Sequence, residues 1–123
     1  MGAVALDKAG NLAAATSTGG TSNCLSGRIG DSCIIGAGCY ANNSSCAVSG
    51  TGDGELLITN VIAHSIAFYM ELKNCSVQDA CDYVIHQQNK NVKGDIGVIA
   101  LDAKGNFGIC FNSERMPYAC VRC

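Results

Sequence analysis

The chain has 123 residues, of which 48% are hydrophobic and 15% are charged, a composition typical of one globular domain and not of a disordered segment. Eight lysines and arginines against ten aspartates and glutamates give a net charge of −2, and no basic run is present, which argues against a nucleic-acid partner. The longest uncharged apolar stretch, residues 56–70, is too short and too polar to span a bilayer, so we expect no membrane insertion. No secretion signal opens the sequence, which favours a cytoplasmic protein.

The first expected element is a β-hairpin near the start of the chain. Residues 3–7 and 11–16 are short apolar runs on either side of a Lys-Ala-Gly turn. The phrase Ala-Leu-Asp-x-x-Gly-Asn at residues 5–11 returns at residues 100–106. The repetition predicts a second hairpin of the same design near the other end.

Between the hairpins, a glycine-rich segment is followed by two predicted helices. Residues 19–54 are punctuated by glycines, and a short strand is expected at residues 47–49. Hydrophobic residues then recur at helical spacing over residues 56–70, which predicts one helix of about five turns. A second helix is predicted to begin at Ser76, an N-cap with Asp79 three residues on. Its apolar stripe consists of Val77, Ala80, Cys81, Val84 and Ile85, and it is expected to end over residues 91–94.

The order of these elements predicts an α+β fold. Strands, glycine-rich loops, helices and a final hairpin follow one another, which fits a layered sheet-and-helix domain and not an alternating βαβ fold. This order alone implies no function.

Nine cysteines are a high content for this length and allow more than one interpretation. A disulfide framework is typical of small secreted domains, but the odd number and the apolar surroundings of Cys46 and Cys110 favour reduced thiols. Cys120 and Cys123 form a Cys-x-x-Cys motif without a second pair at zinc spacing, so we expect no metal site and no cofactor. A cysteine-based metal or redox module is a minor alternative.

The first candidate binding segment is Gly-Arg-Ile-Gly-Asp at residues 27–31. Arg28 offers a fixed cation that binds a carboxylate bidentately, and Asp31 offers an acceptor for an ammonium group. The glycines let the backbone turn both side chains toward one point, which suits the two opposite charges of an α-amino acid. An internal salt bridge between Arg28 and Asp31 is an equally open interpretation.

The second candidate segment is Gly-Thr-Gly-Asp-Gly at residues 50–54, just before the predicted long helix. Backbone amides at a helix N-terminus, with the hydroxyl of Thr51, predict an anion or oxyanion site. A phosphate-binding loop is disfavoured because no Lys-Ser/Thr pair follows the glycines. His64 and His86 lie at helical positions far along the chain from these loops and are expected to be structural, so a Ser–His or Cys–His mechanism has little support.

Five ordered motifs together resemble the β subunit of the plant-type L-asparaginase or isoaspartyl aminopeptidase family. They lie at residues 2–7, 10–20, 27–32, 36–43 and 47–55, and the similarity covers nearly the whole chain. The resemblance implies an N-terminal-nucleophile hydrolase with an αββα sandwich, made as one precursor that cleaves itself so that a threonine begins the β chain. It also implies that residues 1–123 are the single-domain β-subunit half, which pairs with an α subunit from the same precursor in an (αβ)2 assembly.

The resemblance further implies an enzyme that hydrolyses the side-chain amide of L-asparagine and β-aspartyl (isoaspartyl) dipeptides. The terminal threonine is the nucleophile, and its own α-amine takes the hydroxyl proton, so no histidine is needed. Thr18 supplies a supporting hydroxyl that orients this nucleophile, and Thr51 and Gly52 form the oxyanion hole. Arg28 holds the α-carboxylate of the substrate and Asp31 its α-ammonium. The full set of implied substrate-binding residues is Arg28, Ile29, Gly30, Asp31, Thr51, Gly52, Asp53 and Gly54.

The chain departs from the family pattern at three places. Met1 stands where the family has the residue after the nucleophile, so the threonine would precede this chain, and the last family strand is not reached. Arg115 stands where a small residue is common, close to the expected cleft. Two alternatives follow, namely a catalytically inactive fragment or paralogue that keeps the fold, and a glycosylasparaginase-like amidase. The Thr-Ser-Thr-Gly-Gly sequence at residues 16–20 disfavours the second.

Overall fold

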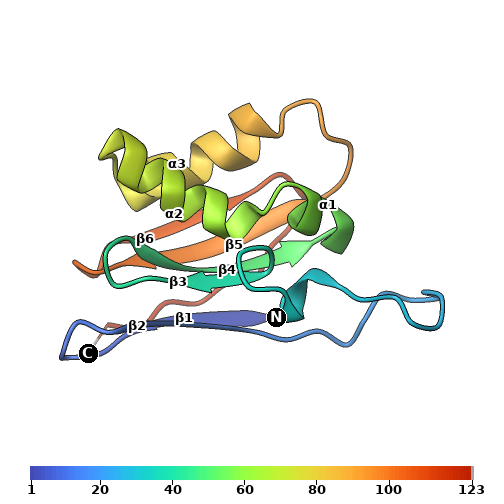
Figure 1. Cartoon of the computed structure of the whole chain (residues 1–123), viewed down its shortest axis with the longest axis horizontal. Helices are drawn as coiled ribbons and strands as arrows, with labels where there is room; N and C mark the ends of the chain where they lie inside the picture. Colours follow the sequence, from blue (N-terminus) through green and yellow to red (C-terminus); the bar gives the residue numbers. More distant parts are fainter. Residues whose placement is uncertain (123) are drawn as a thin grey trace.

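The computed structural model describes residues 1–122, which form two antiparallel sheets and a group of helices (Figure 1). The two-stranded sheet contains β1 (Gly2–Leu6) and β2 (Leu12–Thr16), and the four-stranded sheet contains, in spatial order, β3 (Cys39–Ala41), β4 (Cys46–Gly52), β5 (Ile96–Asp102) and β6 (Phe107–Phe111). The helical segments are η1 (Asp31–Cys33), α1 (Gly54–Thr59), α2 (Ile62–Lys73), α3 (Val77–Asp82) and the π-helical η2 (Tyr83–Gln88). The predicted mixture of helices with antiparallel strands is therefore confirmed.

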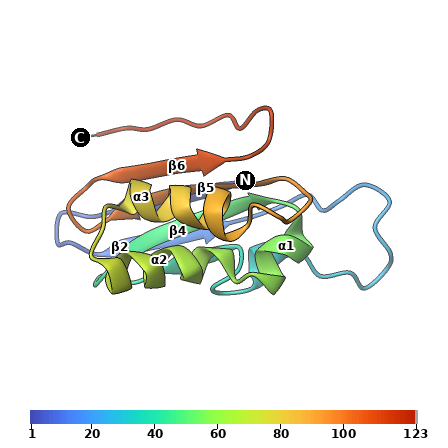
Figure 2. The ribbon, with the colours of Figure 1, turned by 90° about the horizontal axis from the view of Figure 1, so that it is seen from above.

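These elements lie in three layers. Helices α2 and α3 cover one face of the four-stranded sheet, and the β1–β2 hairpin lies against its other face (Figures 1 and 2). Because β4 is covered on both sides, five consecutive residues from Cys46 to Gly50 are buried. The largest fully buried side chains belong to the sheet and the helices that cover it: Leu57, Ile62, Ile66, Ile85, Ile96, Val48, Val77, Val84, Val98, Cys46 and Cys81.

The two predicted hairpins are present and share one turn design. The carboxylate of Asp7 accepts hydrogen bonds from the amides two and four residues later, at 2.8 and 2.7 Å. Asp102 does the same between β5 and β6, at 2.9 and 2.8 Å. Gly10 and Gly105 follow with φ of 85° and 82°, a left-handed conformation that glycine adopts without strain. The repeated phrase therefore codes for the same turn twice.

The single long helix predicted over residues 56–70 is wrong. The structure divides this stretch into α1 and α2, because Val61 takes a left-handed conformation with φ of 47°. The side chain of Asn60 donates a hydrogen bond to the carbonyl of Leu56 at 3.0 Å and so occupies an acceptor at the end of α1. Phe68, counted in the predicted apolar stripe, is 55% exposed. Hydrophobic residues continue at helical spacing from α1 into α2, because both helices bury side chains in neighbouring parts of the core.

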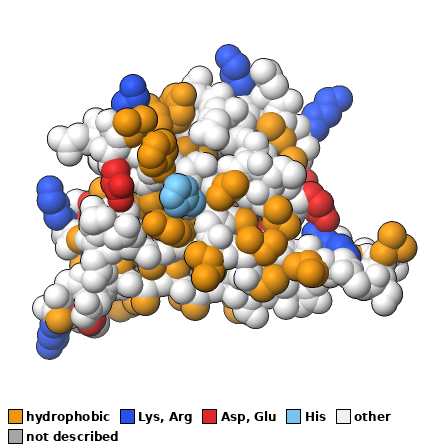
Figure 3. Space-filling model, viewed as in Figure 1, with side chains coloured by type: hydrophobic (Ala, Val, Ile, Leu, Met, Phe, Trp, Pro, Cys, Tyr) orange, Lys and Arg blue, Asp and Glu red, His pale blue; other side chains and the backbone are white. Residues whose placement is uncertain are grey.

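The second predicted helix is confirmed. Ser76 caps it by accepting a hydrogen bond from the backbone amide of Asp79 at 3.1 Å, and all five residues of its predicted stripe are buried. The helix runs through α3 into η2 and ends at Gln88, earlier than expected. Among the described residues, no helix has both the length and the apolarity needed to cross a membrane. On the face drawn in Figure 3, lysine and arginine side chains lie apart from one another and form no basic patch.

Eight cysteines in the described part of the chain are free thiols, as expected from their surroundings; they are Cys24, Cys33, Cys39, Cys46, Cys75, Cys81, Cys110 and Cys120. Cys123, the second residue of the Cys-x-x-Cys motif, lies outside the described residues. Burial raises the pKa of Cys46 and Cys110 to about 12 and raises the pKa of Cys81 well above its ordinary value.

These buried thiols predict that the protein loses stability in alkali. Above the ordinary thiol pKa of 9.0 the unfolded chain loses protons that the folded chain keeps until about pH 12. The free energy of unfolding is therefore expected to be highest below pH 9.0 and to fall as the pH rises from there towards about 12. Urea denaturation at several pH values measures this, and the fall should be smaller in Cys46→Ala. An equal fall in that variant would contradict the assignment.

Candidate active site

Arg28 is held in a bidentate ion pair at the start of α1. Its Nε and Nη2 atoms donate to the two carboxylate oxygens of Glu55, both at 2.9 Å. The arginine side chain is 20% exposed and the glutamate side chain 66%. The pairing raises the pKa of Arg28 and lowers the pKa of Glu55, so both groups are charged at neutral pH. The predicted cation therefore has its guanidinium plane fixed by two bonds.

Glu55 is a partner of Arg28 that was not predicted from the sequence. It belongs to the last of the five family-like motifs, but no role was assigned to it. The signal for it was present, because Glu55 directly follows a segment that carries only three other charges, Arg28, Asp31 and Asp53. The Arg28–Asp31 salt bridge considered as an alternative is not formed, since the ion pair that Arg28 makes within the described chain is to Glu55.

Asp31 nevertheless lies beside Arg28, and both converge on Gly54. A Cβ atom placed on Gly54 would be 2.9 Å from Nη2 of Arg28 and 3.0 Å from Oδ1 of Asp31. The other carboxylate oxygen faces Gly38, where a Cβ would be 2.6 Å away. Asp31 is only 8% exposed. The structure thus brings a cation and a nearly buried carboxylate to one point, as the glycine-rich spacing predicted.

A cavity of about 600 Å³ opens next to this point. Arg28, Asp53, Gly54 and Glu55 line it together with the loop of residues 21–26. Of the other predicted binding residues, Ile29 is 64% exposed, and neither it nor Gly30 or Asp31 lines this cavity. Arg28 therefore faces a space large enough for an amino-acid head group, whereas Asp31 lies beside Arg28 and does not line this space.

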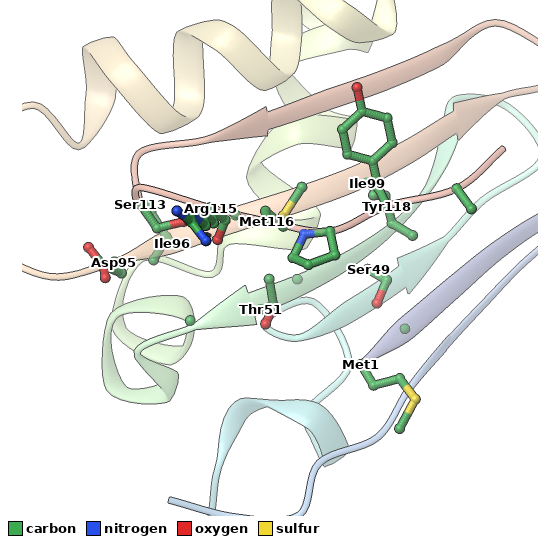
Figure 4. A pocket seen from close by; sticks show the side chains of 16 residues that line it. Met1, Ser49, Thr51, Asp95, Ile96, Ile99, Ser113, Arg115, Met116 and Tyr118 are labelled. Atoms are coloured by element: carbon green, nitrogen blue, oxygen red, sulfur yellow. Dashed lines mark hydrogen bonds between the residues drawn. The ribbon is translucent and has the colours of Figure 1, made fainter.

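Thr51 and Gly52 line a second cleft, of about 570 Å³, on the hairpin side of the four-stranded sheet (Figure 4). The methyl group of Thr51 packs toward β5, where a Cβ on Gly97 would be 3.4 Å from it. The hydroxyl points instead into the space between β4 and Met1 (Figure 4). Arg115 lines the same cleft, so it lies near Thr51 and Gly52.

The backbone around Gly52 is tightly constrained. Gly52 has a φ of 121°, and a Cβ there would collide with the carbonyl oxygen of Asp95. Asp53 donates its amide to that carbonyl at 2.7 Å and accepts the amide of Asp95 through its carboxylate at 3.1 Å. Asp53, predicted to bind substrate, therefore ties the entry of α1 to β5.

The expected helix N-terminus contributes less to this site than the sequence suggested. The helix that begins here, α1, has only six residues. The carbonyl of Asp53 accepts the amides of Leu56 and Leu57 at 3.0 and 3.1 Å. The macrodipole of a long helix is thus not available, and an oxyanion site at this place depends on the hydroxyl of Thr51 and on Gly52.

Thr18 follows β2 at the open end of the β1–β2 hairpin, next to the N-terminus of the chain. The ladder pairs Gly2 with Thr16, and the Met1 ammonium donates to the carbonyl of Ser17 at 3.0 Å. The Ser17 amide donates back to the carbonyl of Met1 at 2.8 Å, so this pairing continues to the first residue. A residue joined ahead of Met1 would stand opposite Thr18 in the same register. The Thr18 hydroxyl accepts the amide of Gly20 at 3.0 Å.

A pair of hydroxyl groups, from the half-buried Thr16 and the buried Ser49, fixes this end of the hairpin to the sheet. Thr16 donates to the carbonyl of Gly38 at 3.0 Å, so its oxygen accepts the hydroxyl of Ser49 at 2.6 Å. A Cβ on Gly2 would collide with the Ser49 hydroxyl, which explains glycine at that position. The sequence reasoning assigned no role to Ser49, although a serine within the buried run of β4 was a signal of a hydrogen-bonded role.

The predicted structural role of His64 agrees with its packing. Its ring makes an edge contact with Tyr40, with centroids 5.1 Å apart, and stacks on Phe68 at 6.1 Å. It comes from α2, which lies on the helical side of the sheet (Figure 1), whereas the cleft is lined by Met1 and Gly2 on the hairpin side. His64 is therefore not available to the cleft.

Comparison with known proteins identifies the family of this chain. The asparaginase family profile matches residues 1–122. The chain belongs to this asparaginase family. It is 54% identical over 116 residues to an isoaspartyl peptidase of Salmonella typhimurium, a match that covers 94% of this chain and 37% of that protein. It is 52% identical over 116 residues to an isoaspartyl peptidase of Escherichia coli, which covers 94% of this chain and 36% of that protein. A probable isoaspartyl peptidase/L-asparaginase of Arabidopsis thaliana is 44% identical over 121 residues, covering 98% of this chain and 36% of the relative.

This member of the asparaginase family thus spans little more than a third of the length of the curated relatives that it matches. The family match includes all the residues predicted for the site, from Thr18 to Gly54. Most of each relative lies outside the matched region.

Proposed function

We propose that this chain is the β-subunit half of a hydrolase that cleaves the side-chain amide of L-asparagine and the isopeptide bond of β-aspartyl dipeptides. The observation that carries the proposal is the convergence of Arg28 and Asp31 beside Gly54, because a guanidinium and a carboxylate at one point match the two charges of an α-amino acid. Residues 1–123 act as one domain. Family membership and the names of the related isoaspartyl peptidases support the same substrate class.

In this proposal the nucleophile is a threonine joined ahead of Met1. The antiparallel register would place it opposite Thr18, whose hydroxyl orients it, and its α-amine would take the hydroxyl proton. The hydroxyl oxygen attacks the amide carbonyl of the substrate, and the carbonyl oxygen gains negative charge near Thr51 and Gly52. Ammonia or an amino acid leaves with the proton, and water then releases aspartate from the acyl-enzyme.

Substrate binding would exchange one carboxylate for another on Arg28. Glu55 accepts hydrogen bonds from Nε and Nη2 of Arg28, the two donors that the α-carboxylate of the substrate would need. The glutamate side chain is 66% exposed and can turn into solvent, and an exposed ion pair contributes little to stability. Glu55 thus keeps the guanidinium oriented until substrate arrives. The nearby Asp31 carboxylate then accepts the ammonium group.

The proposal includes a second subunit. Ala3, Ala5, Ala13 and Ala15 form an exposed apolar face on the outer side of the β1–β2 hairpin. We propose that the α subunit of the same precursor covers this face and supplies the missing helical layer of an αββα sandwich, in a cytoplasmic (αβ)2 enzyme. An inactive fragment or paralogue with the same fold is the alternative.

The test uses the protein expressed from its complete gene. Mass spectrometry of the purified subunits is expected to show self-cleavage that leaves a threonine directly ahead of Met1. Ammonia release from asparagine and aspartate release from a β-aspartyl dipeptide are then measured, with glycosylated asparagine as a third substrate. Arg115 places a further cation at the cleft, which favours the dipeptide with its second carboxylate. An uncleaved product without either activity would support the inactive alternative.

A further inference from the structure

Three metal-binding side chains meet on the helical side of the four-stranded sheet. Asp82 is the last residue of α3, His86 belongs to η2, and Cys110 lies on β6. One ligand atom from each (a carboxylate oxygen, a ring nitrogen and the Sγ atom) lies within 4.8 Å of the other two. Asp82 and His86 are exposed, and Cys110 is 4% exposed. We propose that Asp82, His86 and Cys110 bind a zinc ion and leave its fourth coordination position open.

The local fold places the three ligands together. Asp82 and His86 are four residues apart, a spacing that puts both side chains on one side of a helix. The helix changes from α to π geometry between them, at Tyr83, and such turns occur frequently at functional sites. Cys110 pairs with Val98, which is fully buried in the helical-side core, so the thiol faces α3. Figure 2 shows α3 running alongside β6, and the two elements are in contact.

Gln78 fixes the position of Asp82. Its amide nitrogen donates to Oδ1 of Asp82 and to the carbonyl of Ile109, both at 3.0 Å. Its amide oxygen accepts the backbone N–H of Ile109 at 2.9 Å. One glutamine therefore joins α3 to the residue next to Cys110 and leaves the second carboxylate oxygen of Asp82 for a metal. Partners of this kind orient metal ligands in known sites.

The donor set selects the metal. Sulfur, imidazole nitrogen and carboxylate oxygen together are typical ligands of zinc, whereas calcium and magnesium prefer oxygen alone. Zinc replaces the proton of the Cys110 thiol, which is released to the solvent, and the thiolate sulfur then donates an electron pair to the ion. A bound zinc would join the end of α3 and η2 to the edge strand β6.

This zinc site is separate from the cleft. Phe111, the residue after Cys110, pairs with Gly97 and lies on the same face of the sheet as Thr51, so Cys110 points to the opposite face. The sequence predicted no metal site, because its Cys-x-x-Cys motif has no second pair at zinc spacing. The two helical ligands and the cysteine are far apart in the chain, and only the packing of α3 against β6 brings them together.

The test is zinc binding by the protein expressed from its complete gene, after removal of metals with a chelator. Calorimetric titration is expected to show one tightly bound zinc per copy of this chain, and titration with Co²⁺ is expected to give a thiolate charge-transfer band. His86→Gln is expected to weaken zinc binding by at least about tenfold, as is Gln78→Ala. His86 is exposed, so its variant folds even if Cys110→Ser does not. Cys110→Ser should abolish the cobalt band.

The matched controls are His64→Gln and Cys33→Ser, which change the other histidine and an exposed cysteine outside the cluster. Both are expected to bind zinc as the unmodified protein does. Absence of zinc binding, or zinc binding that His86→Gln leaves unchanged, would overturn the proposal. Because the site and the cleft lie on opposite faces, hydrolysis of a β-aspartyl dipeptide measured on the same metal-free samples tests the proposed function independently.

Discussion

Replacement of Thr51 by valine is expected to lower kcat for both proposed substrates by roughly 10²- to 10³-fold, with little change in KM. Valine keeps the shape of threonine, so packing against Gly97 is preserved and only the hydroxyl is lost. The hydroxyl points into the cleft shared with Met1, where charge would develop on the substrate carbonyl oxygen (Figure 4). Steady-state hydrolysis by the mature enzyme measures the effect.

Thr59→Val is a matched control for this prediction. Its hydroxyl donates to the carbonyl of Glu55 at 2.8 Å on α1, outside the cleft. The control is expected to keep kcat within about twofold, because exposed substitutions have small effects. A Thr51→Val enzyme as active as this control would exclude a contribution of the Thr51 hydroxyl to the oxyanion hole.

Replacement of Arg28 by methionine is expected to lower kcat/KM by roughly 10²-fold or more, because the guanidinium group that would hold the substrate carboxylate is removed. Arg28→Lys keeps the charge but not the two parallel donors, so an intermediate loss is expected. Gly54→Ala tests the same pocket without removing either charge, because the new Cβ would lie 2.9 Å from Nη2 of Arg28 and 3.0 Å from Oδ1 of Asp31. It is expected to raise KM mainly.

Glu55→Gln distinguishes a binding role of Arg28 from a purely structural one. If substrate displaces Glu55 from the guanidinium, removal of the competing charge is expected to lower KM. KM and kcat for asparagine and for a β-aspartyl dipeptide, measured on all four variants, provide the comparison. A normal KM in Arg28→Met, or loss of substrate binding in Glu55→Gln equal to that in Arg28→Met, would show that the ion pair supports only the fold.

Local features of this protein could be predicted from its sequence because they depend on neighbouring residues. The aspartate and glycine of the repeated hairpin phrase form their turn within a few residues, and Ser76 caps α3 through an amide three residues away. The convergence of Arg28 and Asp31 was also accessible, since they are three residues apart among glycines. The order of five motifs was sufficient to indicate the family.

The tertiary structure decided the features that depend on contacts between distant segments. The left-handed turn at Val61 interrupts a hydrophobic periodicity that continues on both sides of it. Arg28 pairs with Glu55, 27 residues away, because η1, which follows Arg28, packs against α1. Cys110 meets Asp82 and His86 for the same reason, the packing of α3 on β6. Hydrophobic burial drives such packing without a directional code, so which polar side chains meet is determined only when the layers are assembled.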